Sequence, residues 1–177
     1  MGLVVGSARI DENGKISGGA LGDNNGREVS TQPYYLHSKG WYVLRPKTIA
    51  LANGLASAMS DACANNHIGY DQSNRYGVIK MVRKYGSMKA IKEKTEADCS
   101  SLVRGCCIQN GFDPGDFATS GEAAKLEATV RVLHQLLQKP QSHLHRKSHL
   151  PLPEHIKQAL IVICVTVREN RTYQWLC

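Results

Sequence analysis

The amino-acid sequence predicts an α+β fold, because a stretch with β character is followed by a series of helical patterns. Residues 41–44 (WYVL) combine aromatic and aliphatic side chains, as strands do. Residues 48–64 repeat apolar side chains at helical spacing, and shorter helical patterns follow them. Hydrophobic residues make up 42% of the 177 residues, which is enough for one domain with its own core.

The first part of the chain, residues 1–45, is predicted to be an N-terminal segment of strands and loops. Asn13 and Gly14 lie between the stretches 8–10 and 15–16, as in a hairpin turn. Residues 41–44 are the strand of this segment, and Pro46 ends it.

Residues 46–128 are predicted to be the helical part. The apolar side chains of residues 48–64 form two neighbouring stripes, which indicates a well-buried helix: Leu51, Leu55, Ala58 and Ala62, and Ala52, Ala56, Met59 and Cys63. Residues 67–72 are then interpreted as a loop. Two short helices, at 78–84 and 88–94, are separated near Gly86.

The next helix, predicted between Asp98 and Gly111, contains the candidate catalytic residue. Asp98 suits the N-cap position and Gly111 suits a C-terminal stop. Residues 95–98 offer an alternative, a capping box that starts the helix three residues earlier. A turn at 113–116 and a helix from about 121 to 128 follow.

The tail, residues 129–177, differs from the rest of the chain. Its net charge is +5, against +2 for residues 1–128. All 16 glycines lie at or before Gly121, whereas five of the seven histidines lie in the tail. Two interpretations stay open: a true basic tail, or translation out of frame.

Cys99 is the candidate nucleophile. If Asp98 caps the helix, Cys99 lies in its first turn, where free backbone N–H groups and the helix dipole stabilise a thiolate or an oxyanion. A buried structural thiol beside an ordinary cap is the alternative from these residues alone. The six cysteines show no disulfide framework, so we expect reduced thiols.

Three segments carry a resemblance to a known family. Residues 98–103 (DCSSLV) resemble the nucleophile motif of the papain-like cell-wall cysteine hydrolases, the NlpC-type family and its phage amidase relatives. Residues 69–72 (GYDQ), with Arg75, resemble the segment that precedes this nucleophile in phage lysins. Residues 8–19, 22–23 and 28–30 are similar to the opening of prophage lysins of Gram-positive hosts.

This resemblance implies a papain-like domain that hydrolyses peptidoglycan as an amidase or endopeptidase, with bacterial peptidoglycan as its partner and no cofactor. Cys99 is implied to attack an amide carbonyl of the stem peptide. Tyr70 is implied to orient the substrate or to help stabilise the oxyanion. Asp71 and Ser100 are assigned to substrate binding with it. A loop turn packed on the core is the alternative for Tyr70 and Asp71.

The family also supplies a catalytic histidine, often directly after a glycine, from a strand well after the nucleophile. No Gly-His pair follows Cys99, and the tail histidines qualify by residue type alone: His134, His143, His145, His149 and His155. We therefore hypothesise that the reading frame slips near Thr129, and we expect weak activity or none from this chain. Translation of the other two frames past codon 128 tests this, since one of them should restore Gly-His.

Two other functions start from the tail. The spacing of His143, His145 and His149 could hold zinc, and scattered basic residues suit an anionic polymer such as nucleic acid. Neither has a supporting motif, so we expect no metal site and no nucleic-acid partner.

We expect no membrane span and no signal peptide, hence a cytoplasmic product that reaches the wall by a phage-dependent route such as a holin. The sequence gives no basis for an oligomeric state.

Overall fold

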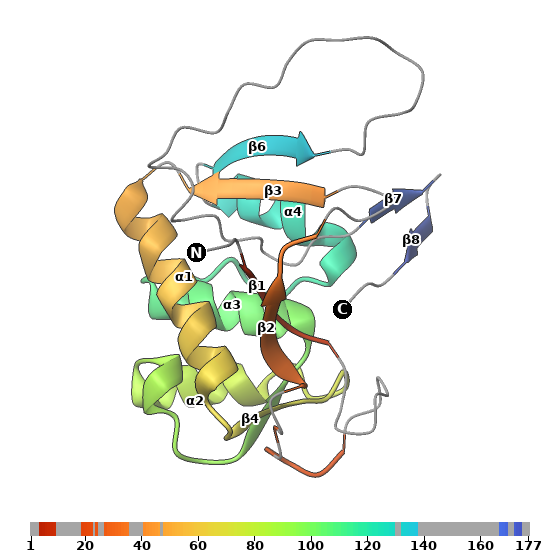
Figure 1. Cartoon of the computed structure of the whole chain (residues 1–177). Coiled ribbons are helices and arrows are strands. Elements are labelled where there is room, and N and C mark those ends of the chain that lie inside the picture. Colours follow the sequence, from red (N-terminus) through yellow and green to blue (C-terminus); the bar gives the residue numbers. More distant parts are fainter. Residues whose placement is uncertain are drawn as a thin grey trace, which may run out of the picture.

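A computed structural model describes residues 4–9, 19–22, 24, 27–35, 41–46, 48–129, 132–137, 167–169 and 172–174 (Figure 1). In order, its elements are β1 (Val4–Ala8), β2 (Val29–Pro33), β3 (Trp41–Pro46), α1 (Ile49–Ala64), β4 (Ile68–Tyr70), α2 (Gly77–Tyr85), the short 3₁₀ helix η1 (Met88–Ala90), β5 (Thr95–Ala97), α3 (Cys99–Gln109), α4 (Thr119–Thr129), β6 (Val132–Leu137), β7 (Val167–Glu169) and β8 (Thr172–Gln174). The α+β prediction is confirmed.

The described strands form four two-stranded sheets. Three are antiparallel: β1 with β2, β3 with β6, and β7 with β8. The pair β3–β6 joins the predicted N-terminal segment to the tail, with Trp41 opposite Leu137, and it lies beside α4 in Figure 1. The fourth sheet pairs β4 with β5 in parallel, and it positions the candidate site.

The helix predicted at residues 48–64 is confirmed as α1. The side chain of Thr48 accepts a hydrogen bond from the backbone N–H of Leu51 at 3.3 Å, which caps the helix. The two predicted apolar stripes face inward, and the members that are fully buried are Ala52, Leu55, Ala58, Met59 and Ala62.

Two other helix predictions are also confirmed. α2 stops at Gly86, whose φ of +81° is the left-handed conformation that glycine adopts without strain. α4 contains the helix predicted at 121–128. The hairpin turn predicted at Asn13 and Gly14 lies outside the described residues.

Three local predictions are wrong. Residues 68–70 are a buried strand, not a loop, because they pair with β5. Residues 95–97 are that partner strand, so the earlier helix start at 95–98 is excluded. Residues 88–94 contain only one 3₁₀ turn, because Ile91 is extended and buried against the core. In each case tertiary pairing or packing decides the backbone conformation of a short segment.

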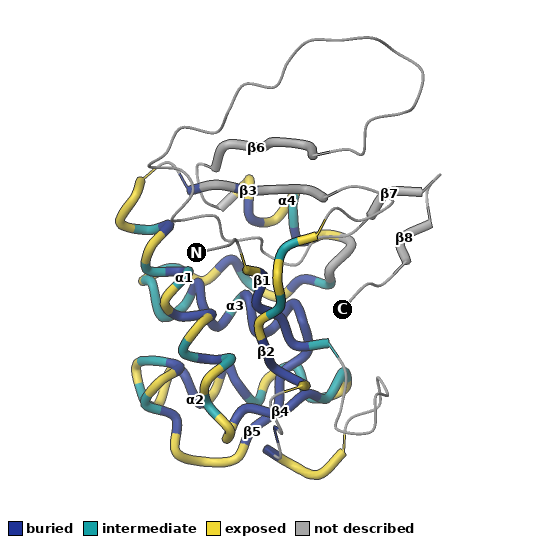
Figure 2. Tube along the Cα trace, viewed as in Figure 1, coloured by how far each residue is buried: buried dark blue, intermediate teal, exposed yellow. Residues whose placement is uncertain are grey.

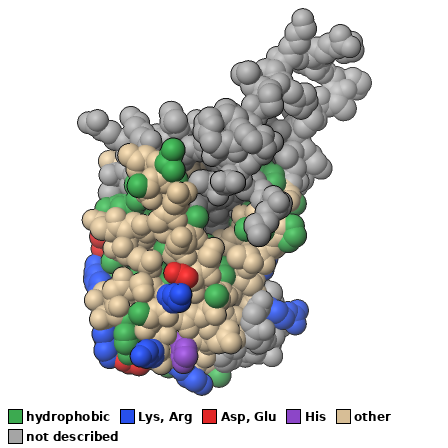
Figure 3. Space-filling model, turned by 60° about the vertical axis from the view of Figure 1, so that its left-hand side comes forward, with side chains coloured by type: hydrophobic (Ala, Val, Ile, Leu, Met, Phe, Trp, Pro, Cys, Tyr) green, Lys and Arg blue, Asp and Glu red, His purple; other side chains and the backbone are tan. Residues whose placement is uncertain are grey.

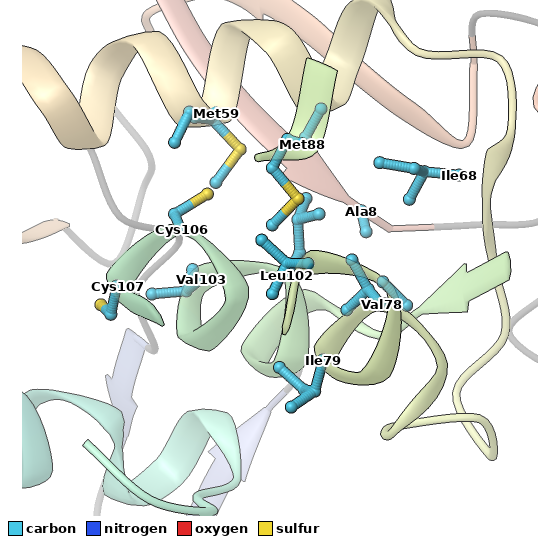
Figure 4. Packing of buried hydrophobic residues seen from close by; sticks show 14 of the residues in the cluster. Ala8, Met59, Ile68, Val78, Ile79, Met88, Leu102, Val103, Cys106 and Cys107 are labelled. Carbon is cyan, nitrogen blue, oxygen red and sulfur yellow. The ribbon is translucent and has the colours of Figure 1, made fainter. Parts of the chain in front are cut away.

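The core lies between α1, α2 and α3 (Figure 2). Figure 4 shows Met59 of α1 and Cys106 of α3 pointing toward one another. On α3, the side chains that face this core are buried: Leu102, Val103, Cys106 and Cys107. Gly105 lies on the same helix where Met88 approaches closely: a Cβ at Gly105 would be 2.5 Å from the Met88 Cε atom. α3 is therefore a central helix of the core.

Candidate active site

The parallel pair β4–β5 brings two distant segments of the chain together. Tyr70 lies opposite Ala97, and the backbone N–H of Asp71 donates to the carbonyl oxygen of Ala97 at 3.2 Å. Parallel strands end at the same edge of their sheet. Tyr70 and Asp71 therefore lie beside the strand that leads directly into Asp98 and Cys99.

Asp98 caps α3 as predicted. One carboxylate oxygen, Oδ1, accepts from the backbone N–H of Ser101 at 2.7 Å. The Ser101 hydroxyl in turn accepts from the backbone N–H of Asp98 at 2.9 Å, which completes a capping box. Cys99 is thereby fixed as the first residue of the helix, and this residue is 3% exposed.

The other predicted site residues surround this helix start. Ser100 is buried, and its hydroxyl donates to Asp98 Oδ2 at 3.3 Å. Tyr70 is also buried, whereas Asp71 is half-buried. The Asp71 carboxylate accepts from the backbone N–H and the hydroxyl of Ser73, at 2.7 and 2.8 Å, and so closes the turn after β4.

The third segment that resembles the family, which contains Glu28, contacts the strand that bears Tyr70. Glu28, just before β2, is fully buried, and its Oε2 atom accepts from the backbone N–H of Tyr70 at 3.3 Å. Gly69 lies between two carboxylates: a Cβ there would be 2.7 Å from Glu96 Oε2 and 3.2 Å from Glu28 Oε2. A side chain at position 69 would therefore displace one of these carboxylates.

Arg75 connects the helix start to the loop before α4, a role that its position in the sequence did not indicate. Its Nε atom lies 3.1 Å from Asp98 Oδ2, and its guanidinium also donates to Asp116 at 3.2 Å and to the carbonyl oxygen of Phe117. The Asp98 side chain is 7% exposed. Arg75 thus compensates a charge that the cap places in a buried position.

The loop before α4 is also held by Asp113. Its carboxylate accepts two hydrogen bonds from Arg104, at 2.7 and 3.0 Å, and one from Arg83 at 2.6 Å. The Arg104 hydrogen bonds are the main reason why the pKa of Asp113 falls to about 2. Gly115 completes the turn with a φ of +80°, and its N–H donates to Asp113 at 2.8 Å. These contacts fix where α4 begins.

Glu122, on the first turns of α4, is a residue that the sequence analysis missed. The residue is 2% exposed, and neither of its carboxylate oxygens has a hydrogen-bond partner among the described residues. Burial raises the pKa of Glu122 well above its usual range, and the nearby Cys99 and Asp98 raise it further. A glutamate in a helix of mixed polar composition normally faces solvent, so the sequence carried no signal for this position.

The remaining described cysteines differ from Cys99 in position. Cys63, Cys99, Cys106 and Cys107 are all free thiols, as predicted. Burial raises the pKa of Cys63 to about 11 and those of Cys106 and Cys107 further. These three thiols lie in the C-terminal halves of their helices, away from the N-terminal ends where a thiolate is stabilised, so their positions suit structural residues. Cys164 and Cys177 lie outside the described residues.

No described histidine side chain accompanies Cys99. His67 is exposed, and its Nδ1 atom lies 3.1 Å from Asn65 Oδ1. With Asp61, Lys89 and Lys92 it lines a separate hollow of about 610 Å³, and Figure 3 shows basic side chains near the lower edge of one face. His134 belongs to β6, where only its backbone is described, opposite Leu44.

The zinc candidates of the tail and most of its basic residues lie outside the described part of the chain. Within the described part, no group of three or more histidine, cysteine or acidic side chains could hold a metal ion. Nor does any described helix combine the length and apolar character needed to cross a membrane.

These features define an α+β domain with a cysteine at the capped start of a central helix, beside a strand that bears a tyrosine and an aspartate. A family model described as an endolysin-like domain matches residues 5–164, and the chain belongs to this family. Membership indicates a cell-wall hydrolase of the phage type, with peptidoglycan as substrate. The comparison with curated proteins and the comparison with solved structures gave no match.

Proposed function

We propose that this protein cleaves an amide or peptide bond of the peptidoglycan stem peptide, with Cys99 as nucleophile in a papain-like arrangement. One observation supports this most directly: the β4–β5 pair places Tyr70 and Asp71 beside the capped helix start that carries Cys99. Residues that the sequence separates by almost thirty positions thus form one local group. The family's wall-hydrolase character is consistent with this use.

The chemistry follows from the helix start. The thiolate of Cys99 forms a bond to the carbonyl carbon, and the carbonyl π electrons move to its oxygen. Free backbone N–H groups of the first turn of α3 are suited to stabilise that oxyanion. When the C–N bond breaks, the amine leaves with a proton, and water then hydrolyses the thioester. Tyr70, Asp71 and Ser100 are proposed to position the stem peptide.

The proposed mechanism has two further requirements. Cys99 is 3% exposed, so a substrate reaches its sulfur only after side chains around it move. A base must also take the thiol proton, and we assign none of the tail histidines to this role. The frame change near Thr129 stays a prediction, tested by translating the other frames; the family match runs past that point, to residue 164.

The test compares three forms of the full chain on purified Gram-positive peptidoglycan. Because we expect weak activity or none, released fragments are identified by mass spectrometry, which detects small amounts and also reveals the bond cleaved. Release should stop in Cys99→Ser and continue in Cys63→Ser, a matched control whose thiol is in α1.

Two results would overturn the proposal. Undiminished release by Cys99→Ser would exclude Cys99 as nucleophile. No release by the unaltered chain would refute hydrolysis by this chain, the result expected if the reading frame does change near Thr129. In the proposed setting, the protein acts on the wall after a phage-dependent release from the cell.

A further inference from the structure

A hollow of about 610 Å³ lies apart from the candidate active site. Three pieces of the chain surround it: the C-terminal end of α1, the turn that leads into β4, and η1 with the residues that follow it. Its volume is in the range of sites that bind small molecules or a short length of polymer. The proposed mechanism uses none of its lining residues.

The hollow and the candidate active site lie at opposite ends of the parallel pair β4–β5. His67, which lines the hollow, directly precedes β4, and its carbonyl oxygen accepts from the backbone N–H of Thr95, the first residue of β5, at 2.8 Å. Asp71 and Asp98 directly follow the other ends of these strands. Strands of three residues are roughly 10 Å long, so one sheet separates two distinct places on the molecule.

Hydrogen bonds of Asn65 join the walls of the hollow. Its side-chain amide donates to the carbonyl oxygens of Met88 and Ile91, at 2.8 and 2.9 Å. Its Oδ1 atom accepts from the backbone N–H of His67 at 3.0 Å. These contacts connect the end of α1 to both other walls, so the fold forms the hollow in advance and a ligand does not have to order it.

The hollow borders a strongly basic segment, residues 78–94. This segment contains six lysine and arginine residues, all exposed, and one acidic residue, so its net charge is +5. Because residues 1–128 carry +2 in all, the rest of that part carries −3. Figure 3 shows lysine and arginine side chains near the lower edge of one face, with a histidine among them. Such a concentration of charge favours an anionic ligand.

Two lysines of this segment, Lys89 and Lys92, line the hollow itself. Both are exposed, and among the described residues neither forms an ion pair, whereas Lys84 on α2 pairs with Glu93. An ammonium group is a compact charge that suits the oxygens of a phosphate. The two lysines also offset the partial negative charge at the C-terminal end of α1.

The other lining groups show that a bare anion is not the best ligand. Asp61 is half-buried and would repel an anion placed next to it, but its carboxylate can accept from a hydroxyl group. The exposed side-chain amide of Asn66 can also bind hydroxyl groups. Ala64 and the buried Ile91 supply apolar contacts. This lining suits a ligand in which phosphates alternate with hydroxyl-bearing carbons.

We propose that the hollow binds a polyol-phosphate polymer of the bacterial wall. Lys89 and Lys92 bind a phosphodiester, while Asp61 and Asn66 bind hydroxyl groups of the neighbouring polyol. The family acts on the cell wall, where such polymers lie beside peptidoglycan. Bound in this way, the domain stays on the wall, and the opposite end of the β4–β5 pair remains free to contact a stem peptide. The proposal rests on the family's wall substrate and not on Cys99 as nucleophile.

The first experiment measures sedimentation of the full chain with purified Gram-positive walls. One sample is intact, and the other is treated with hydrofluoric acid, which cleaves phosphodiesters and leaves peptidoglycan. Binding to the treated walls should be at least about tenfold weaker, because the charged contacts with the phosphodiester are lost. Soluble poly(glycerol phosphate) should displace the chain from intact walls. Undiminished binding to treated walls would overturn the proposal.

Two double variants then locate the site. Lys89→Gln with Lys92→Gln should weaken binding to poly(glycerol phosphate) about tenfold. Lys80→Gln with Lys84→Gln is the matched control, because it removes two exposed charges of the same segment outside the hollow. Equal weakening by the two variants would show general attraction to the basic segment and would overturn a site in the hollow. Urea midpoints equal to that of the unaltered chain verify that both variants fold.

Duplex DNA tests the choice of polymer. A duplex is stiff over many base pairs and should bind more weakly than poly(glycerol phosphate), because it cannot enter the hollow. Binding of DNA that is as tight, and lost in the Lys89 and Lys92 variant, would assign the hollow to nucleic acid and overturn the proposal.

The outcomes are separable from those of the proposed function. Phosphodiester-dependent binding by a chain that releases no fragments would refute the hydrolase and leave the polymer site established. Fragment release that requires Cys99, without any effect of hydrofluoric acid treatment on binding, would refute the polymer site alone.

Discussion

The backbone N–H of Asp71 donates a hydrogen bond to the carbonyl oxygen of Ala97 at 3.2 Å. This contact extends the parallel pairing of β4 and β5 by one residue, to the point where the chain turns into α3. The start of α3 is therefore fixed from two sides, by the capping box within the helix and by the neighbouring strand.

The cap of α3 is tested at Asp98. Asp98→Ala removes the acceptor for the Ser101 N–H and should lower the free energy of unfolding by about 1–2 kcal/mol. Asp98→Asn keeps an oxygen acceptor and should retain most of the capping contribution. Urea denaturation of both variants gives the comparison, and an equal loss in the two would show that charge, not capping, is the main contribution of Asp98.

Arg75 is expected to contribute more than the other arginines of the loop network. Arg75→Gln leaves the Asp98 carboxylate, 7% exposed, without its counter-ion and should cost about 1–2 kcal/mol of unfolding free energy. Arg83→Gln is the matched control: Arg83 is 57% exposed and Asp113 keeps Arg104, so the loss should stay within about 0.5 kcal/mol. If both variants unfold at the same urea concentration, Arg75 has no special role.

Gly105 is expected to be required by packing. Gly105→Ala brings a methyl group too close to the side chain of Met88, because the Cβ would be 2.5 Å from the Met88 Cε atom. We expect a loss of about 1–3 kcal/mol in unfolding free energy, partly recovered when Met88 is shortened to alanine in the same chain.

Gly121 supplies the control for Gly105. A Cβ there meets nothing within 4 Å, so Gly121→Ala in α4 should stabilise the protein by about 0.5–1 kcal/mol. If Gly105→Ala is as stable as the unaltered chain, the contact with Met88 is not tight.

Glu122 should make the stability of the protein depend on pH. Folding raises its pKa above the usual 4.5, so the folded state holds the proton more tightly than the unfolded state. Its contribution is fully present below about pH 4.5 and decreases as the pH rises toward the folded-state pKa, by about 1.4 kcal/mol for each pH unit. Glu122→Gln should remove this slope and be more stable at neutral pH. Urea denaturation at a series of pH values measures it, and parallel curves for the two chains would contradict it.

The sequence predicted the long elements well, because their signals are local. The apolar repeat of residues 48–64 and the left-handed stop at Gly86 depend only on neighbours in the chain. Asp98 as the cap of α3 was found in the same way. The short segments 68–70 and 95–97 were misassigned, since three residues become a strand only when a partner strand lies beside them.

The candidate site likewise combines features that local sequence signals predict and features that depend on tertiary contacts. The sequence by itself determined that Cys99 begins a helix, because capping is a matter of three or four consecutive residues. Only the tertiary structure decided which groups lie near that helix: Tyr70 and Asp71 through strand pairing, Arg75 through its ion pair with Asp98, and Glu122 through the packing of α4 on α3. Burial and long-range charge determine these relationships, and neither quantity is encoded in the spacing of residues along the chain.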